Sequence, residues 1–187
     1  MRQWNHQTKR SGIKTAERLN MEDNIIEYAK QLKSQFATGN TTEHSFRAHL
    51  YNLFKSLHPQ QYYTMTNEPQ RIKCGAPDYI IQCKGIPVGY IETKDIVKNL
   101  DKLDEREKNQ FKRYIESLDN IIYTNYLDFR LYRNHELVKE ISIGEIKNGK
   151  VLLLPDNVKG LAELIQDFVD YRGLPITSPQ MAIYQKI

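Results

Sequence analysis

The feature that most constrains the fold is a β-hairpin predicted in the middle of the chain. Residues Tyr79–Cys83 and Val88–Lys94 are two short runs rich in Ile, Val and Tyr, joined by Lys84-Gly85-Ile86-Pro87. Two such runs separated by a short loop that contains Gly are typical of an antiparallel strand pair. We therefore expect the residues just before the first run to lie close to the end of the second.

The pattern on either side of this hairpin predicts helices and further strands. Apolar residues recur at helical spacing in four segments, namely 22–36, a stretch after Asn40-Thr41-Thr42 that ends before Pro59, 104–118 and 158–171. Strands are predicted at 62–66 and 72–74 (a pair, or one strand interrupted by Pro69), at 120–124 and 129–133, and in a final hairpin of 137–143 and 151–154 around Asn148-Gly149. This order predicts an α/β fold, with a mixed central sheet flanked by helices on both faces.

Length and cysteine content restrict the class of protein. A chain of 187 residues is long enough for one domain with a buried core. Cys74 and Cys83 are too few for a disulfide framework and match no zinc-binding spacing with the five histidines. No apolar run approaches the roughly 18 residues of a membrane helix, and the N-terminus lacks the apolar segment of a signal peptide. We expect a cytoplasmic, reduced location, no structural metal and no membrane partner.

Basic residues are concentrated at the N-terminus. Residues 1–20 contain five of the 27 basic residues and one of the 23 acidic residues, which leaves 22 of each in the remainder. A basic segment before a neutral body is typical of nucleic-acid contact, and also of a disordered leader. We predict three parts: a basic arm at 1–20, one domain at 21–172, and a tail or linker at 173–187.

The hairpin is expected to bring two acids and a lysine together. Asp78 stands just before the first predicted strand, and thirteen residues separate it from Glu92 near the end of the second. Residues two apart in a strand point to one face, so Glu92 and Lys94 share a side. Two carboxylates at close range repel each other unless a divalent cation separates them, and such an oxygen-lined site suits Mg²⁺, with Mn²⁺ as a substitute. We expect Asp78 and Glu92 to bind this metal, with the Thr93 backbone carbonyl as a third ligand. Lys94 would hold or deprotonate the water that attacks a phosphodiester.

The spacing of these residues is not specific by itself. Glu145-Ile146-Lys147 and Pro155-Asp156 repeat parts of the pattern, and Glu92 with Lys94 could form an ion pair on an exposed strand face. The context favours the metal site, because Tyr90-Ile91 leads directly into Glu92 and places it in the body of the sheet. Glu145 stands instead beside an Asn-Gly turn.

Three side chains outside the hairpin are candidate members of the same site. Glu43 stands three residues before Phe46, in line with the apolar stripe of its helix, and could reach a metal through water. It could instead close a capping box with Asn40. Gln110 and Tyr114 are four residues apart on one helical face, where they could hydrogen-bond the site or the DNA backbone. Taken singly, Tyr114 is also compatible with the core and Gln110 with the surface.

Two lysines that follow the hairpin are candidate phosphate contacts. Lys98 and Lys102 could each add nonspecific, salt-sensitive affinity for DNA. Acidic residues alternate with the basic ones in this region, so a solvated helix face is the alternative interpretation.

These residues resemble the PD-(D/E)xK nuclease superfamily. They resemble more closely the Mrr-like endonuclease domain at the front of single-chain restriction–modification enzymes of the type ISP and type IIG classes. The matching pieces occur in order over roughly residues 40–135: Thr42–Arg47, Gly75–Asp78, Gly89–Asp95, Gln110–Tyr114 and Tyr126–Arg130. Phe111 stands where such relatives often have Leu, and the resemblance fades after about residue 140.

The resemblance implies a restriction-endonuclease-like sheet and Mg²⁺-dependent cleavage of double-stranded DNA. It assigns Asp78 and Glu92 as metal ligands and Lys94 as the water-positioning residue. It assigns Glu43 as an auxiliary acid, and Gln110 with Tyr114 as the QxxxY element. It also implies fused helicase or methyltransferase and target-recognition domains, and a transient dimer for cutting both strands. The chain has no phosphate loop of the GxxxxGKS or GxxxxGKT type and no Asn-Pro-Pro-Tyr motif, so we expect it to be a fragment of a longer protein. The alternatives are a catalytically silent DNA-binding or assembly module, and an unrelated structural domain whose acids form surface pairs.

Overall fold

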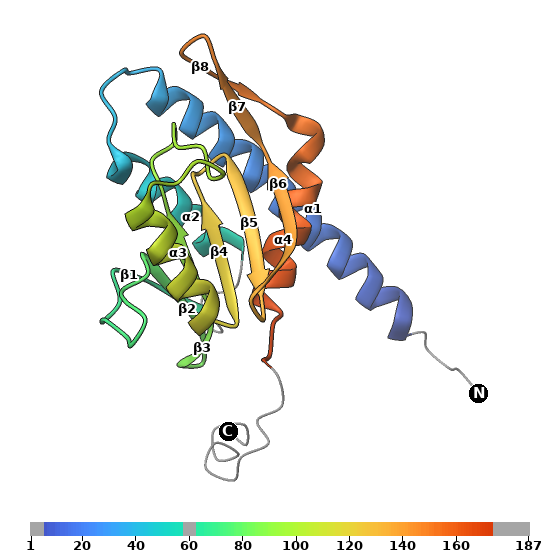
Figure 1. Ribbon diagram of the computed structural model, residues 1–187. Coiled ribbons are helices and arrows are strands. Elements are labelled where there is room, and N and C mark those ends of the chain that lie inside the picture. Colours follow the sequence, from blue (N-terminus) through green and yellow to red (C-terminus); the bar gives the residue numbers. More distant parts are fainter. Residues whose placement is uncertain (1–5, 58–62, 174–187) are drawn as a thin grey trace, which may run out of the picture.

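A six-stranded mixed sheet forms the centre of the molecule (Figure 1). The computed structural model describes residues 6–57 and 63–173. The strands follow the order of the sequence across the sheet: β1 (Tyr63–Asn67), β2 (Tyr79–Cys83), β3 (Ile86–Thr93), β4 (Asn120–Thr124), β5 (Asp128–Arg133) and β6 (Glu136–Ser142). β3 and β4 are parallel, whereas the other neighbouring pairs are antiparallel. The chain crosses between the parallel strands through α3 (Glu105–Ser117).

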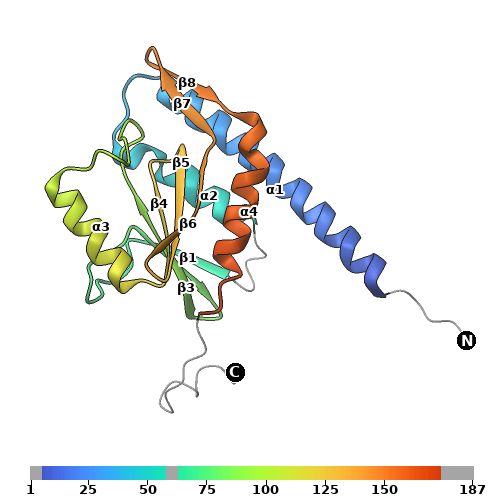
Figure 2. The same ribbon diagram turned by 45° about the vertical axis from the view of Figure 1, so that its right-hand side comes forward.

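Helices cover both faces of this sheet, as the sequence predicted. α3 lies on one face, and α1 (His6–Phe36), α2 (Arg47–Leu57) and α4 (Val158–Val169) lie on the other (Figures 1 and 2). α3 begins with a capping box between Asp104 and Glu107, and its Phe111 packs edge-on against the rings of Tyr123 and Tyr132. All five residues of β4 are buried, because this strand has a helix layer on either side.

The two faces of β3 therefore meet different surroundings. Ile91 lies in the main core, which α1, α2 and α4 share with the sheet. Its neighbour Glu92 is paired in register with Tyr123 of β4, whose ring packs against α3. Glu92 consequently lies on the α3 face, in a second and smaller layer that contains Tyr114, Ile115 and Ile121.

Two segments differ here from the sequence-based expectation. α1 begins at His6 instead of near residue 22, so residues 6–20 of the basic arm continue the helix, while residues 1–5 lie outside the described residues. Residues 72–74 form no strand, because Ile72 makes only an isolated bridge with Gly75 and β1 pairs with β2. The tail was predicted at 173–187, and its residues 174–187 lie outside the described residues, so it stays a prediction.

The predicted final hairpin is also wrong in its pairing. Residues 136–142 form β6 and join the main sheet beside β5, because Asn134 and His135 make a tight turn with φ of 49° and 74°. The separate two-stranded sheet consists of β7 (Gly144–Lys147) and β8 (Lys150–Leu153), around the predicted Asn148-Gly149 turn.

No helix within residues 6–57 or 63–173 combines the length and the apolar character needed to cross a bilayer.

Candidate active site

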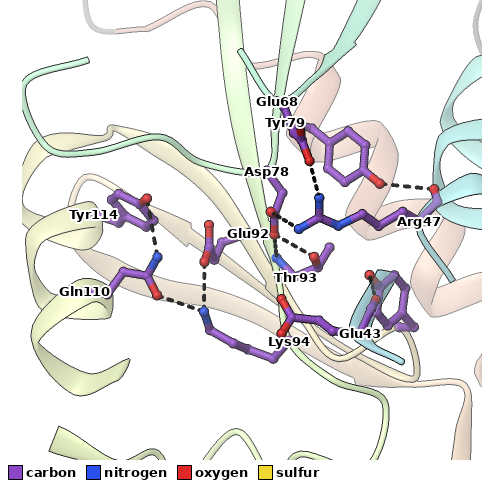
Figure 3. A network of polar contacts seen from close by, with 11 residues as sticks. Glu43, Arg47, Glu68, Asp78, Tyr79, Glu92, Thr93, Lys94, Gln110 and Tyr114 are labelled. Carbon is purple, nitrogen blue, oxygen red and sulfur yellow. Dashed lines mark hydrogen bonds and ion pairs between the residues drawn. The ribbon is translucent and has the colours of Figure 1, made fainter. Parts of the chain in front are cut away.

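The β2–β3 hairpin brings Asp78 to the end of β3. Lys84 and Gly85 form its turn, with φ of 50° and 81°, and Tyr79 is paired in register with Ile91. Asp78 Oδ2 accepts hydrogen bonds from the Thr93 backbone N at 2.8 Å and from Thr93 Oγ1 at 2.6 Å (Figure 3). Asp78 is thus hydrogen-bonded to β3, the strand that carries Glu92, as the predicted hairpin led us to expect.

Glu92 and Lys94 lie on the same face and contact each other. Lys94 Nζ donates to Glu92 Oε1 at 2.8 Å, and the two residues are 8% and 3% exposed. Glu92 Oε2 is buried and makes no hydrogen bond with any residue that the structure describes. The expected shared face is present, and it is buried instead of exposed, which argues against a simple surface ion pair.

The surroundings of Glu92 disfavour its charged form. Burial raises the pKa of its carboxyl to about 7, and the negative charge of Asp78 adds to this shift. Lys94 and, more weakly, the nearby backbone amide of Asp78 act in the opposite direction. A carboxyl with this pKa, beside a second acid and with one oxygen unpaired, is able to receive a cation.

α3 completes the surroundings of Lys94. Gln110 Oε1 accepts a second hydrogen bond from Lys94 Nζ at 2.8 Å, and the Tyr123 ring lies 5.5 Å from the same nitrogen. Gln110 Nε2 in turn lies 3.5 Å from the hydroxyl of Tyr114, which is 2% exposed (Figure 3). Gln110 therefore contacts the lysine of the candidate site directly, and Tyr114 contacts it only through Gln110.

The loop before Asp78 passes directly over Tyr114. Gly75 has a φ of 139°, and a Cβ at this position would lie 2.9 Å from the ring and hydroxyl atoms of Tyr114. Only glycine fits this approach without displacing its neighbour.

Arg47 is the site residue that sequence reasoning missed. It is the first residue of α2, and its Nη2 donates to Asp78 Oδ1 at 2.6 Å while its Nη1 donates to Glu68 Oε1 at 2.8 Å. No spacing rule connects a helix to a hairpin 31 residues later. One signal in the sequence did include Arg47. It is the last residue of the Thr42–Arg47 stretch that resembles the nuclease family, but the resemblance assigned no role to it.

Glu43 opens a 3₁₀ turn, η1 (Glu43–Phe46), beside the site. Its side chain points toward Lys94 and Thr93 in Figure 3, and its backbone carbonyl accepts a hydrogen bond from the Tyr126 hydroxyl at 3.0 Å. Thr42 and Ser45 form the capping box of this turn, so the alternative in which Glu43 caps with Asn40 is wrong.

The structure does not bring Lys98 or Lys102 into this network. Lys98 Nζ forms an ion pair with Glu107 Oε2 at 2.7 Å, which raises the lysine pKa. Lys102 is exposed. Their contact with phosphate stays a prediction.

The donor set fits a hard cation that keeps part of its water shell. Within the described ranges, no three or more His, Cys, Asp or Glu side chains are grouped to hold a metal ion, so the candidate ligands are the pair Asp78 and Glu92. Glu92 Oε2 is free, and three donors leave about one of the four acceptor directions of Asp78 open. Mg²⁺ is commonly bound by one or two carboxylates, with waters and substrate phosphates completing the shell. Coordination by the Thr93 carbonyl stays a prediction.

Comparison with known proteins gives a likeness in structure. No family profile and no curated protein matches the chain. A chain in the cryo-EM structure of a DrdV–DNA complex superposes on 88% of this chain with a TM-score of 0.64 and 24% identity. This chain shares its fold with the matched part of the DrdV chain. The restriction-endonuclease-like architecture predicted from the sequence is confirmed, and the matched region spans 15% of the DrdV chain.

Proposed function

We propose that this chain is a Mg²⁺-dependent endonuclease domain of the PD-(D/E)xK type, which hydrolyses phosphodiester bonds of double-stranded DNA. The observation that carries the proposal is the state of Glu92. Glu92 is 3% exposed, and its Oε2 makes no hydrogen bond with a described residue. Burial and the charge of Asp78 raise the pKa of its carboxyl to about 7. Strongly shifted acids with a specific charged partner concentrate at functional sites. The fold shared with part of a DNA-bound DrdV chain supports DNA as the substrate.

Five residues of the network have a role in this proposal. Asp78 and Glu92 hold the metal ion, which when bound stabilises charge on the phosphate and on the leaving oxygen. Lys94 is held by Glu92 and Gln110 with its ammonium on the site face, where it orients the water that attacks phosphorus in line. The bond that breaks leaves the phosphate on the 5′ end of the product. Glu43 acts as an auxiliary acid through water.

The proposal includes a larger enzyme. Because the match covers 15% of the DrdV chain, we propose that target recognition, and a helicase or methyltransferase activity, belong to other domains of a restriction–modification enzyme. One site per chain cuts one strand, so two copies have to meet to cut both.

Nicking of supercoiled plasmid tests the proposal with a matched pair of variants. Glu92→Gln keeps an acceptor for Lys94 and removes the charge, so we expect the Mg²⁺-dependent nicking rate to fall by about 100-fold or more, the scale at which one charge-stabilising group acts. Glu145→Gln is the control, because Glu145 has the same spacing to a lysine and pairs with Lys147 at 2.6 Å on β7, outside the site network. Nicking by Glu92→Gln at the wild-type rate would sink the assignment.

One observation favours a second candidate, a silent DNA-binding module. Arg47 and Thr93 already engage both oxygens of Asp78. If wild-type protein retards plasmid in a gel but never nicks it in Mg²⁺ or Mn²⁺, this candidate replaces the endonuclease.

A further inference from the structure

We propose that Arg47 is the phosphate-binding residue of a DNA-strand subsite beside Asp78. In this proposal Arg47 exchanges its ion pair with Asp78 for a DNA phosphate once a metal ion is bound. The inference rests on the proposed function, because it takes Asp78 as a metal ligand.

The hydrogen bonds of Arg47 leave much of its guanidinium capacity unused. Nη2 binds Asp78 and Nη1 binds Glu68, so neither acid receives the paired hydrogen bonds that a guanidinium offers to a planar anion. The Nε atom is buried and has no partner among the described residues. The Glu68 side chain is 70% exposed, and ion pairs of that kind are weak and screened by salt.

A metal ion on Asp78 acts directly on this arrangement. Thr93 supplies both donors to Oδ2, so Oδ1 is the oxygen that Arg47 holds. A divalent cation on the same carboxylate repels the guanidinium, and the Asp78 and Arg47 side chains are each only 14% exposed, where solvent screens that repulsion little. A bound metal ion would therefore weaken the pair between Arg47 and Asp78 and would free donors of the arginine.

A groove beside Arg47 offers a place for a phosphodiester backbone. It has a volume of about 520 Å³, and apolar atoms form most of its exposed lining, which includes Ala48, Tyr51 and Tyr79. Three polar side chains, from η1, α2 and β1, also line it: His44, Asn52 and Asn67. Glu68 is the one acid among the described residues that line it, and Arg47 neutralises that acid. Arginine with polar neighbours is the usual means of holding a DNA phosphate without reading sequence. Arg47 lines this groove and also contacts Asp78, so the groove adjoins the proposed metal site.

Two binding measurements on Arg47→Ala test the exchange, and Arg130→Ala is a matched control. Arg130 also pairs with two acids, Asp101 at 2.7 Å and Glu140 at 2.6 Å, and its side chain is 14% exposed, as is that of Arg47. Mn²⁺ binding without DNA is followed by electron paramagnetic resonance. Binding of a duplex in Ca²⁺ is followed by fluorescence anisotropy at several salt concentrations.

The proposal expects opposite changes in the two measurements. Arg47→Ala should bind Mn²⁺ about fivefold or more tightly, the lower range of coupling between sites. It should bind the duplex more weakly, with a salt dependence less steep by about one unit for the lost phosphate contact. Arg130→Ala should change neither. Arg47→Lys keeps the positive charge without the paired donors of the guanidinium. Its affinities for Mn²⁺ and for the duplex should lie between those of wild type and Arg47→Ala. This variant replaces Arg47→Ala in the test if the alanine variant does not fold.

Each other outcome overturns a stated part of the inference. Weaker Mn²⁺ binding by Arg47→Ala makes Arg47 a positioning residue for Asp78 and overturns the exchange. Unchanged duplex binding overturns the subsite. Wild-type protein that binds no Mn²⁺ overturns the proposed function together with the exchange. Wild-type protein that binds Mn²⁺ and loses it in Glu92→Gln, with no effect of Arg47→Ala, overturns the exchange alone.

Discussion

Glu92 is the residue at which folding and function conflict. Its side chain lies in the layer between the sheet and α3, where an anion is poorly solvated, and Asp78 adds a second negative charge. Lys94 offsets only part of this cost. Such a position is hard to explain by stability, since a neutral side chain of the same shape would serve the fold better.

The raised pKa of Glu92 predicts how stability depends on pH in the absence of metal. The folded state holds the Glu92 proton up to about pH 7, whereas the unfolded state releases it near the ordinary value of 4.5. Glu92 therefore contributes its full stability below pH 4.5 and loses it as the pH rises to 7, about 3 kcal/mol in all. Urea unfolding in EDTA from pH 4 to 8 should show this fall as the difference between wild type and Glu92→Gln. A difference that is flat with pH would mean that Glu92 titrates normally.

At the scale of elements, the loop that enters β2 packs against α3, where Gly75 meets Tyr114 and the Cys74 carbonyl accepts a hydrogen bond from Arg113 Nε at 3.4 Å. Gly75 lies on Tyr114, and Tyr114 contacts Gln110, which holds Lys94. The path from this loop to the lysine runs through side chains in contact, so a change at Gly75 should reach the site.

Gly75→Ala tests this path, with Gly85→Ala as control. Both glycines have positive φ, but a Cβ at Gly75 would lie 2.9 Å from Tyr114, and a Cβ at Gly85 would have nothing within 4 Å. We expect Gly75→Ala to lower the free energy of unfolding by about 1–3 kcal/mol more than Gly85→Ala, the usual effect of overpacking. Thermal and urea unfolding measure the difference, and the nicking rate should fall only for Gly75→Ala. Equal losses of stability would show that Tyr114 moves away freely.

The elements that could be predicted are those that local chemistry defines. The β2–β3 hairpin has Gly in its loop, and α3 carries apolar residues at helical spacing, so both were predicted. The β5–β6 turn was missed because its two residues with positive φ, Asn134 and His135, include no glycine, so the local turn signal is weaker than that of Asn148-Gly149.

The same limit applies to the site. Asp78, Glu92 and Lys94 lie on one hairpin, and local spacing was enough to group them. Gln110 was grouped with them by its helical face and by resemblance, but Arg47 reaches Asp78 through packing of α2 against the sheet edge. Contacts of that kind depend on tertiary structure and leave no periodic signal.

At the scale of the whole molecule, the described residues contain one pair of candidate metal ligands, Asp78 and Glu92 on the β2–β3 hairpin. The rest of the chain beyond residue 20 carries equal numbers of basic and acidic residues, so a strong nonspecific attraction to DNA is not expected from its net charge. We therefore expect the isolated chain to bind DNA weakly, to dissociate quickly, and to cut one strand in each binding event.

This expectation predicts the order of products from supercoiled plasmid. At low protein concentration nicked circles should accumulate first, and linear DNA should appear later, with a rate that rises about as the square of protein concentration because two copies have to meet. Gel electrophoresis over a protein titration measures both rates. Linear DNA that forms at once, with a first-order dependence on protein, would indicate a preformed dimer or two sites.

The three donors that converge on Asp78 make its amide analogue a poor chemical probe. Asparagine is nearly isosteric, but it offers a single acceptor oxygen, and Thr93 already presents two donors to one side of the carboxylate. If the amide oxygen faces Thr93, its NH₂ group confronts the guanidinium of Arg47, donor against donor. Asp78→Asn would thus rearrange the contacts with Arg47 and Thr93 as well as removing a charge, whereas Glu92→Gln keeps an acceptor for the hydrogen bond from Lys94.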